Sequence, residues 1–152
     1  MTPLMESRII KGPDGPPHSI FINLGTNDIV RANPDWRSAW NRLMTDTASI
    51  PCEVLFTINP FVNSYAHGDG PTVQDINGAI AEEHAAQPTR VHIIDWGAAV
   101  RADHAAIHAA QAEGSTHLPP PLIRADGIHP TVQGQRWIAQ HIESTLDTVC
   151  RQ

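Results

Sequence analysis

Three short runs of hydrophobic residues divide the chain, and each is followed by polar or glycine-rich positions. The runs cover residues 19–24, 54–58 and 91–95, and they are rich in β-branched and aromatic side chains. Short, mainly apolar runs of this kind are typical of buried strands. The pattern therefore predicts three buried strands.

Two helices are predicted between these runs from their start signals. Asn33 is expected to cap the first helix, with Pro34 at its first position. Thr72 and Asp75 form a capping-box pattern at the start of the second helix, which Pro88 ends. The side chains expected to face the core are Trp36, Trp40, Leu43, Met44 and Thr47 in the first helix and Val73, Ile76, Ile80 and His84 in the second.

Two further helices are predicted after the third strand. The alanine-rich segment from Ala98 to Ala112 has strong helix propensity and stops at Gly114. The last helix, from Thr131 to about Val149, is amphipathic. It is expected to bury Trp137, Ile138, Ile142, Leu146 and Val149.

The remaining segments are predicted as connections. Residues 2–10 have the pattern of a short helix end, residues 12–17 are a loop, and residues 118–121 are stiff and extended. The irregular stretch 59–71 is long enough to be a functional loop rather than a simple connection. Strands that alternate with helices predict an α/β fold, in which a parallel sheet is covered on both faces. At 152 residues, we expect a single domain over 1–152.

Composition and charge exclude several classes of function. A net charge of -6 and a single lysine, Lys11, leave no basic surface for nucleic acid. No apolar run approaches the ~20 residues that span a bilayer, and Met1 to Glu6 lacks the features of a secretory signal, so we expect no membrane insertion. The compartment stays open.

The chain contains two cysteines and nine histidines, which are residue types that form cross-links or bind metals. Cys52 and Cys150 are too few for a disulfide framework or a zinc site, and whether they form one bridge is left open. Of nine histidines, only His104 and His108 have helical i, i+4 spacing. Because no Cys or Glu partner lies near them, the interpretation favours no metal site, and no cofactor is predicted.

The segment from Leu122 to Thr131 contains the strongest candidate chemistry. Asp126 and His129 lie three residues apart on a loop that Gly127 can bend and Pro130 terminates. A carboxylate that faces an imidazole holds one tautomer and stabilises the protonated ring, as a general base for acyl transfer requires. The structural alternative is a loop-capping Asp126 beside an ordinary half-buried His129.

A second candidate site follows the first predicted strand. Ligands in open parallel sheets bind beyond the carboxyl ends of the strands. Gly25 and Asn27 lie at such an end, where a glycine N–H and a side-chain amide can stabilise a developing oxyanion. The structural alternative is a turn in which Asn27 and Asp28 bond to nearby backbone.

Taken together, the two blocks resemble the SGNH (GDSL-type) hydrolases over about residues 18–147. Gly25-Thr26-Asn27-Asp28 and Asp126-Gly127-Ile128-His129 carry the resemblance, and the flanking 93–96 and 130–134 agree with it. It implies a three-layer α/β/α flavodoxin-like fold that hydrolyses or transfers an acyl group, often acetyl, on small-molecule, carbohydrate or lipid esters. By this resemblance Asn27 is the oxyanion-hole amide, His129 the base and Asp126 its orienting partner, while Asp28 is a structural neighbour.

The chain departs from the family at the nucleophile. Family members begin with a strand that leads to a Gly-Asp-Ser block, followed by a glycine block. Neither block occurs in this sequence, so we expect an N-terminally truncated version of the fold. Ser64 is the least implausible substitute, but its surroundings do not resemble a nucleophile turn. The missing strand would be central, so its absence should leave an unpaired sheet edge.

Three hypotheses follow for function. The first is the C-terminal portion of an ester hydrolase or acyltransferase that retains the base, the orienting acid and one oxyanion donor. The second is a non-catalytic module that binds an acyl or sugar ligand, or that pairs with a second copy through the exposed edge. The third is an enzyme completed by a separately encoded serine segment.

Overall fold

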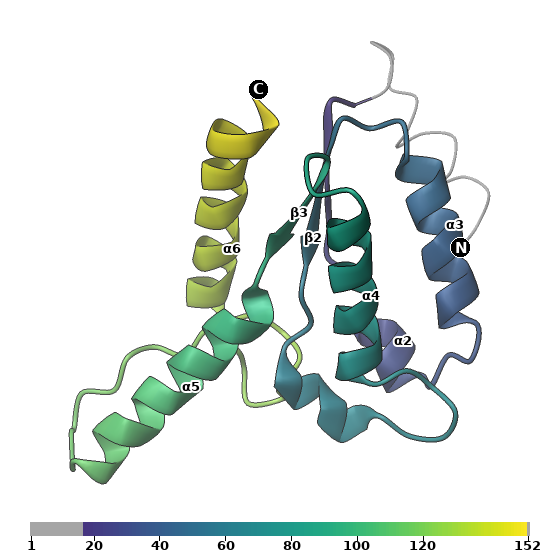
Figure 1. Ribbon diagram of the computed structural model, residues 1–152. Helices are drawn as coiled ribbons and strands as arrows, with labels where there is room; N and C mark the ends of the chain where they lie inside the picture. Colours follow the sequence, from purple (N-terminus) through teal and green to yellow (C-terminus); the bar gives the residue numbers. More distant parts are fainter. Residues whose placement is uncertain (1–16, 152) are drawn as a thin grey trace.

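The computed structural model describes residues 17–151 of the chain. The helix end predicted at residues 2–10 and most of the loop predicted at 12–17 lie outside the described residues. Three strands, β1 (Ser19–Ile22), β2 (Cys52–Phe56) and β3 (Val91–Ile94), form a parallel sheet in the order β1-β2-β3. The mixed α/β class with a parallel sheet flanked by helices is therefore confirmed (Figure 1).

Helices pack on both faces of this sheet. On one face lie α3 (Trp36–Thr47) and α4 (Val73–Ala86), and on the other lie α5 (Trp96–Ala112) and α6 (Val132–Thr145) (Figure 1). The two faces bury separate hydrophobic clusters. The first includes Trp40, Met44, Leu55, Ile76 and Ile80, and the second includes Val54, Phe56, Trp96, Val100 and Leu122.

β1 and β3 are shorter than predicted, β2 begins and ends two residues earlier than predicted, and β1 is only half-buried. Ile22 is buried, whereas Ile20 and Phe21 are partly exposed. Within residues 17–151, β1 is hydrogen-bonded to a strand on one side only, as expected for an edge strand. Leu24, predicted to lie in the strand, is 50% exposed because the chain has already left the sheet.

The start predicted for the first helix was wrong. Helix α3 begins at Trp36 with Asp35 as its N-cap. Asn33 instead donates its amide N–H to Asp28 Oδ1 (2.6 Å) and accepts the backbone N–H of Asp35 (3.1 Å). The asparagine therefore stabilises the preceding turn, because its short polar side chain competes with helix capping.

The capping box of the next helix is confirmed. Thr72 Oγ1 accepts the backbone N–H of Asp75 (3.2 Å), and Asp75 Oδ2 accepts the backbone N–H of Thr72 (2.8 Å). Of the predicted inner face, Val73, Ile76 and Ile80 are buried, and His84 is half-buried with its Nδ1 2.6 Å from the carbonyl oxygen of Val91.

The last two helices differ from the prediction at their starts and in their depth. Helix α5 starts at Trp96, two residues early, because Asp95 caps it by accepting the N–H of Ala98 (2.9 Å). Helix α6 starts after the Thr131 cap and continues as the π-helix η2 (Leu146–Cys150). The side chains predicted to be buried on this helix pack on the second cluster but stay half-exposed, namely Trp137, Ile138, Ile142, Leu146 and Val149.

The long loop after β2 is partly regular. It contains the 3₁₀-helix η1 (Pro60–Tyr65), which Asn59 caps by accepting the backbone N–H of Phe61 (3.0 Å). The five-residue helix α2 (Thr26–Val30) packs against it. Both short helices were missed because a single turn carries no hydrophobic period.

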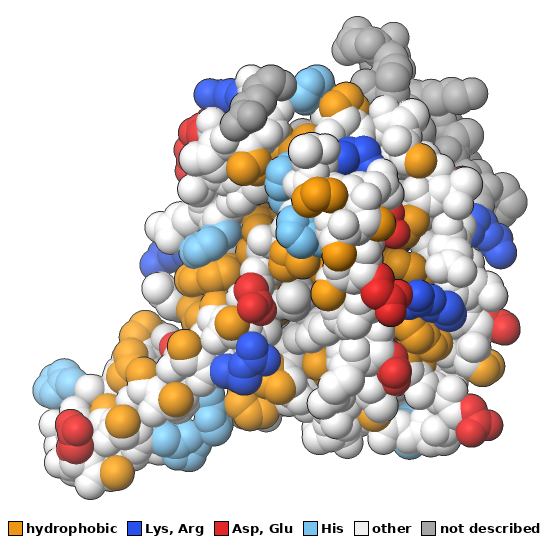
Figure 2. Space-filling view, viewed as in Figure 1, with side chains coloured by type: hydrophobic (Ala, Val, Ile, Leu, Met, Phe, Trp, Pro, Cys, Tyr) orange, Lys and Arg blue, Asp and Glu red, His pale blue; other side chains and the backbone are white. Residues whose placement is uncertain are grey.

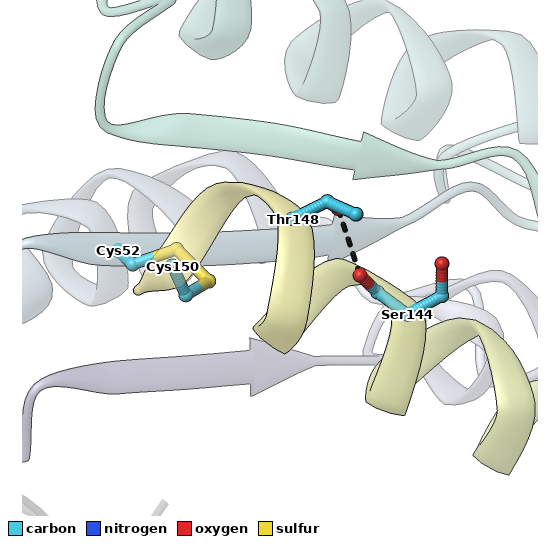
Figure 3. The surroundings of a disulfide bond; sticks show 4 residues. All are labelled: Cys52, Ser144, Thr148 and Cys150. Carbon is cyan, nitrogen blue, oxygen red and sulfur yellow. Dashed lines mark hydrogen bonds between the residues drawn. A yellow bond between two sulfur atoms is a disulfide. The ribbon is translucent and has the colours of Figure 1, made fainter. Parts of the chain in front are cut away.

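A disulfide joins the start of β2 to the end of η2. Cys52 and Cys150 are both buried, with Cα atoms 5.4 Å apart (Figure 3). The bond closes a loop of 98 residues that contains every strand and helix after β1, α2 and α3. Cys52 and Cys150, whose pairing the sequence left open, therefore form one disulfide.

The amino ends of β2 and β3 carry a buried ion pair. Glu53 is fully buried, and its Oε2 accepts hydrogen bonds from Arg90 (2.6 Å) and from the Thr47 hydroxyl (3.1 Å). This pair lies opposite the end of the sheet that carries the candidate site. No helix within residues 17–151 has the length and apolar character needed to cross a membrane.

Candidate functional site

The loop that precedes α6 is closed by backbone hydrogen bonds. Arg124 N–H donates to the carbonyl oxygen of His129 (2.9 Å), and Thr131 N–H donates to that of Leu122 (3.0 Å). Ile123 and Pro130 form an isolated antiparallel bridge between these bonds. Residues 124–129 therefore project from a short, defined neck.

Asp126 and His129 face each other across this loop. Asp126 Oδ1 accepts the backbone N–H groups of Ile128 (2.8 Å) and His129 (2.9 Å). Its other oxygen, Oδ2, lies 3.0 Å from His129 Nδ1, which donates to the carboxylate. In the neutral imidazole, Nε2 is then the nitrogen without a proton and can accept one.

The electrostatics of this pair suit an orienting carboxylate. The backbone hydrogen bonds from His129 and Ile128, followed by the bond from the imidazole, lower the pKa of Asp126 from 3.8 to about 2. The carboxylate is therefore ionised over the whole range in which an imidazole titrates. The His129 side chain is 66% exposed, so a reactant has access to its ring.

Tyr65 holds this loop from outside and was missed by the sequence analysis. Its hydroxyl donates to the backbone carbonyl of Asp126 (2.6 Å), which connects η1 to the loop. Gly127, at a φ of 69°, packs so closely on Phe61 that a Cβ there would lie 3.2 Å from the Phe61 Cβ. The only sequence signal for these contacts was the length of the loop at 59–71.

A glycine on α6 fixes the helix against the neck of the loop. A Cβ on Gly134 would lie 2.0 Å from the carbonyl oxygen of Leu122. Thr131 caps the same helix by accepting the N–H of Gly134 (3.1 Å). The position of the loop is therefore coupled to close backbone packing on α6.

The first block is the start of a helix, and not the turn that was the structural alternative for this segment. Gly25 is the N-cap of α2 at a φ of 111°, and its carbonyl oxygen accepts the N–H groups of Asp28 (3.0 Å) and Ile29 (3.2 Å). A Cβ on Gly25 would lie 2.9 Å from the Ile76 side chain. Asn27 lies in the first turn of α2, and its side chain is exposed.

The two blocks lie toward the same end of the sheet, but no hydrogen bond joins them in the described residues. β1, β2 and β3 lead into α2, η1 and α5 at one end of the sheet, which the loop before α6 also reaches (Figure 1). Helix α2 packs on η1, and Tyr65 of η1 binds the Asp126 loop. Within the described part of the chain, no hydrogen bond or ion pair joins Gly25 or Asn27 to Asp126 or His129.

Ser64 does not have the surroundings of a nucleophile. It lies on η1, and its hydroxyl donates to the backbone carbonyl of Phe61 (2.8 Å). No group of three or more His, Cys, Asp and Glu side chains is placed to hold a metal ion within residues 17–151.

Comparison of the chain with protein-family models, with curated proteins and with solved structures gave no match.

Proposed function

We propose that this chain carries the base and its orienting carboxylate of an SGNH-type ester hydrolase or acyltransferase, arranged on a three-layer flavodoxin-like fold. One observation carries the proposal: Asp126 is ionised, held by two backbone N–H groups, and accepts the Nδ1–H of an exposed His129. A loop-capping aspartate alone would not require the second oxygen to meet the imidazole.

In the proposed reaction His129 moves one proton. Its Nε2 removes the proton from a nucleophilic hydroxyl as that oxygen bonds to the carbonyl carbon of the ester. Asp126 stabilises the resulting imidazolium, which returns the proton to the leaving alcohol when the C–O bond breaks. The Asn27 amide and the Gly25 N–H are the proposed donors to the oxyanion, and the substrates are small-molecule or carbohydrate esters.

Ser64, whose hydroxyl donates to the Phe61 carbonyl, is not the nucleophile in this proposal. A triad without one member retains only the ~10³ to 10⁴-fold acceleration that binding and the oxyanion hole supply. We therefore expect the purified chain to show negligible turnover of p-nitrophenyl acetate. Turnover should appear when a Gly-Asp-Ser segment is supplied, and the DNA upstream of this reading frame is the first place to search for one.

The tautomer of His129 tests the proposal without a nucleophile. Two-bond ¹H–¹⁵N NMR correlations should show the Nδ1–H form in the native chain and a mixture in Asp126→Asn, with His67→Ala as the control. A mixture of tautomers in the native chain, unchanged by Asp126→Asn, would contradict an orienting role. Clear esterase activity that His129→Ala abolishes would support the base but reveal a nucleophile within the chain.

The second candidate function is a non-catalytic module that pairs through β1. The half-buried β1, which has one neighbouring strand within residues 17–151, favours this alternative. Light scattering after size-exclusion chromatography separates the two, since a monodisperse monomer argues against pairing of copies through the edge.

A further inference from the structure

Two histidines on α5 form a pair that the proposed ester chemistry does not use. His104 Nε2 lies 3.1 Å from His108 Nε2, and the two ring centroids are 4.2 Å apart. Both side chains are exposed. Histidine side chains gather over the α5 arm that extends from the sheet (Figure 2).

The ring of His104 is held by a neighbour from another element. Its centroid lies 4.7 Å from that of Phe61 on η1, at an interplanar angle of 51°. The imidazole is therefore packed between His108 and an aromatic ring, which limits the rotamers available to it. This contact reduces the entropy that a ligand would have to remove on binding to the pair.

The distance between the two nitrogens allows both to bind one transition-metal ion. With bonds of ~2.0–2.1 Å from imidazole nitrogen to Zn²⁺, nitrogens 3.1 Å apart subtend about 95–102° at the metal. This angle lies between the square-planar and tetrahedral values. In the metal-free state the same distance is a hydrogen bond from one Nε2–H to the other Nε2.

The surroundings leave room for further ligands. The pair lines a groove of about 850 Å³ between α5, η1 and the segment 118–127, together with Gln111, Ser64 and Asp126. Two protein nitrogens occupy only half of a tetrahedral coordination shell. The remaining positions would face the groove and be filled by water or by an anionic ligand.

We propose that His104 and His108 form a two-histidine site for a single divalent transition-metal ion, with Zn²⁺ as the ion to test. The site is independent of the proposed ester chemistry. It lies in the groove that Asp126 borders, so a bound metal would place a positive charge and exchangeable ligands beside the loop that carries His129.

The test is isothermal titration of the full-length, disulfide-intact chain with ZnCl₂ in slightly alkaline buffer. We expect one equivalent to bind. His104→Ala and His108→Ala should each weaken binding by at least about tenfold, since even outer-shell partners of a metal are worth that much. His67→Ala, which removes an exposed histidine outside the pair, should leave the affinity unchanged.

A second measurement locates the ion and uses a variant that keeps the packing of His104 on Phe61. Substoichiometric Cu²⁺ should broaden the NMR signals of Ile107 and Gln111 but not those of Trp40 on the opposite face of the sheet. His108→Gln, which does not alter the Phe61 contact, should abolish this broadening. Absence of Zn²⁺ binding, or binding that persists in the His104→Ala/His108→Ala double variant, would overturn the proposal.

Discussion

The disulfide between Cys52 and Cys150 is expected to supply a large share of the folding stability. It closes a loop of 98 residues, and the chain-entropy relation gives about 4.7 kcal/mol at 25 °C for a loop of that size. Because measured values fall at or below this figure, we expect Cys52→Ala/Cys150→Ala to lower the free energy of unfolding by about 2–5 kcal/mol.

The assay is urea unfolding followed by far-UV circular dichroism, with and without reductant. In thermal unfolding, a loss of 1 kcal/mol lowers the Tm by about 2–4 °C for chains of this size, so the full 4.7 kcal/mol corresponds to a fall in Tm of about 10–20 °C. Reduced wild type should match the double variant, which separates loss of the bond from the change of side chain. Thiol titration of the unreduced, denatured chain should find no free thiol.

Two results would refute this reasoning. Two titratable thiols without reductant would show that the bond is absent. Equal unfolding midpoints for oxidised chain, reduced chain and double variant would show that closing this loop does not constrain the unfolded state.

Three further predictions concern single positions. The Asp126 carboxyl should titrate near pH 2 by NMR, and titration at pH 3.8 would contradict the hydrogen-bonded geometry. Because folding lowers the pKa of this carboxyl, its contribution to stability is complete above pH 3.8 and is lost as the pH falls from 3.8 towards 2. Arg90→Met should lower the free energy of unfolding by about 3–5 kcal/mol, because it strips the buried Glu53 of its cation, whereas the double variant Glu53→Leu/Arg90→Met should recover most of that loss in urea unfolding. Gly134→Ala should shift the backbone NMR signals of 122–131, because its Cβ would overlap the Leu122 carbonyl, whereas Gly78→Ala on α4, where a Cβ meets nothing within 4 Å, should leave them unchanged.

Local sequence signals predicted much of the architecture. The three strands, the capping box at Thr72 and the end of α5 at Ala112 were confirmed, because each depends on neighbours within a few residues. The predicted start of α3 was wrong because the Asn33 side chain hydrogen-bonds to Asp28 instead of capping the helix. Propensity contains no information on that competition.

The candidate site could be predicted only in its local part. Asp126 and His129 are three residues apart, so one loop geometry brings them together. Tyr65 reaches the same loop from 61 positions away, and Cys52 meets Cys150 across 98. Such pairings follow from the three-dimensional path of the chain, which local sequence patterns do not reveal.

The two halves of the proposed site are anchored in different hydrophobic clusters. Ile29 of α2 packs in the cluster on one face, whereas Leu122, at the neck of the Asp126 loop, packs in the cluster on the other. The central strand β2 contributes Leu55 to the first cluster and Val54 to the second. A substitution in either cluster therefore acts directly on one group of proposed catalytic atoms, and it reaches the other group through β2 or through η1, which contacts α2 and holds the Asp126 loop. Substitutions that change the alignment of the two groups can therefore arise in either cluster, while substitutions in β2 act on both clusters at once.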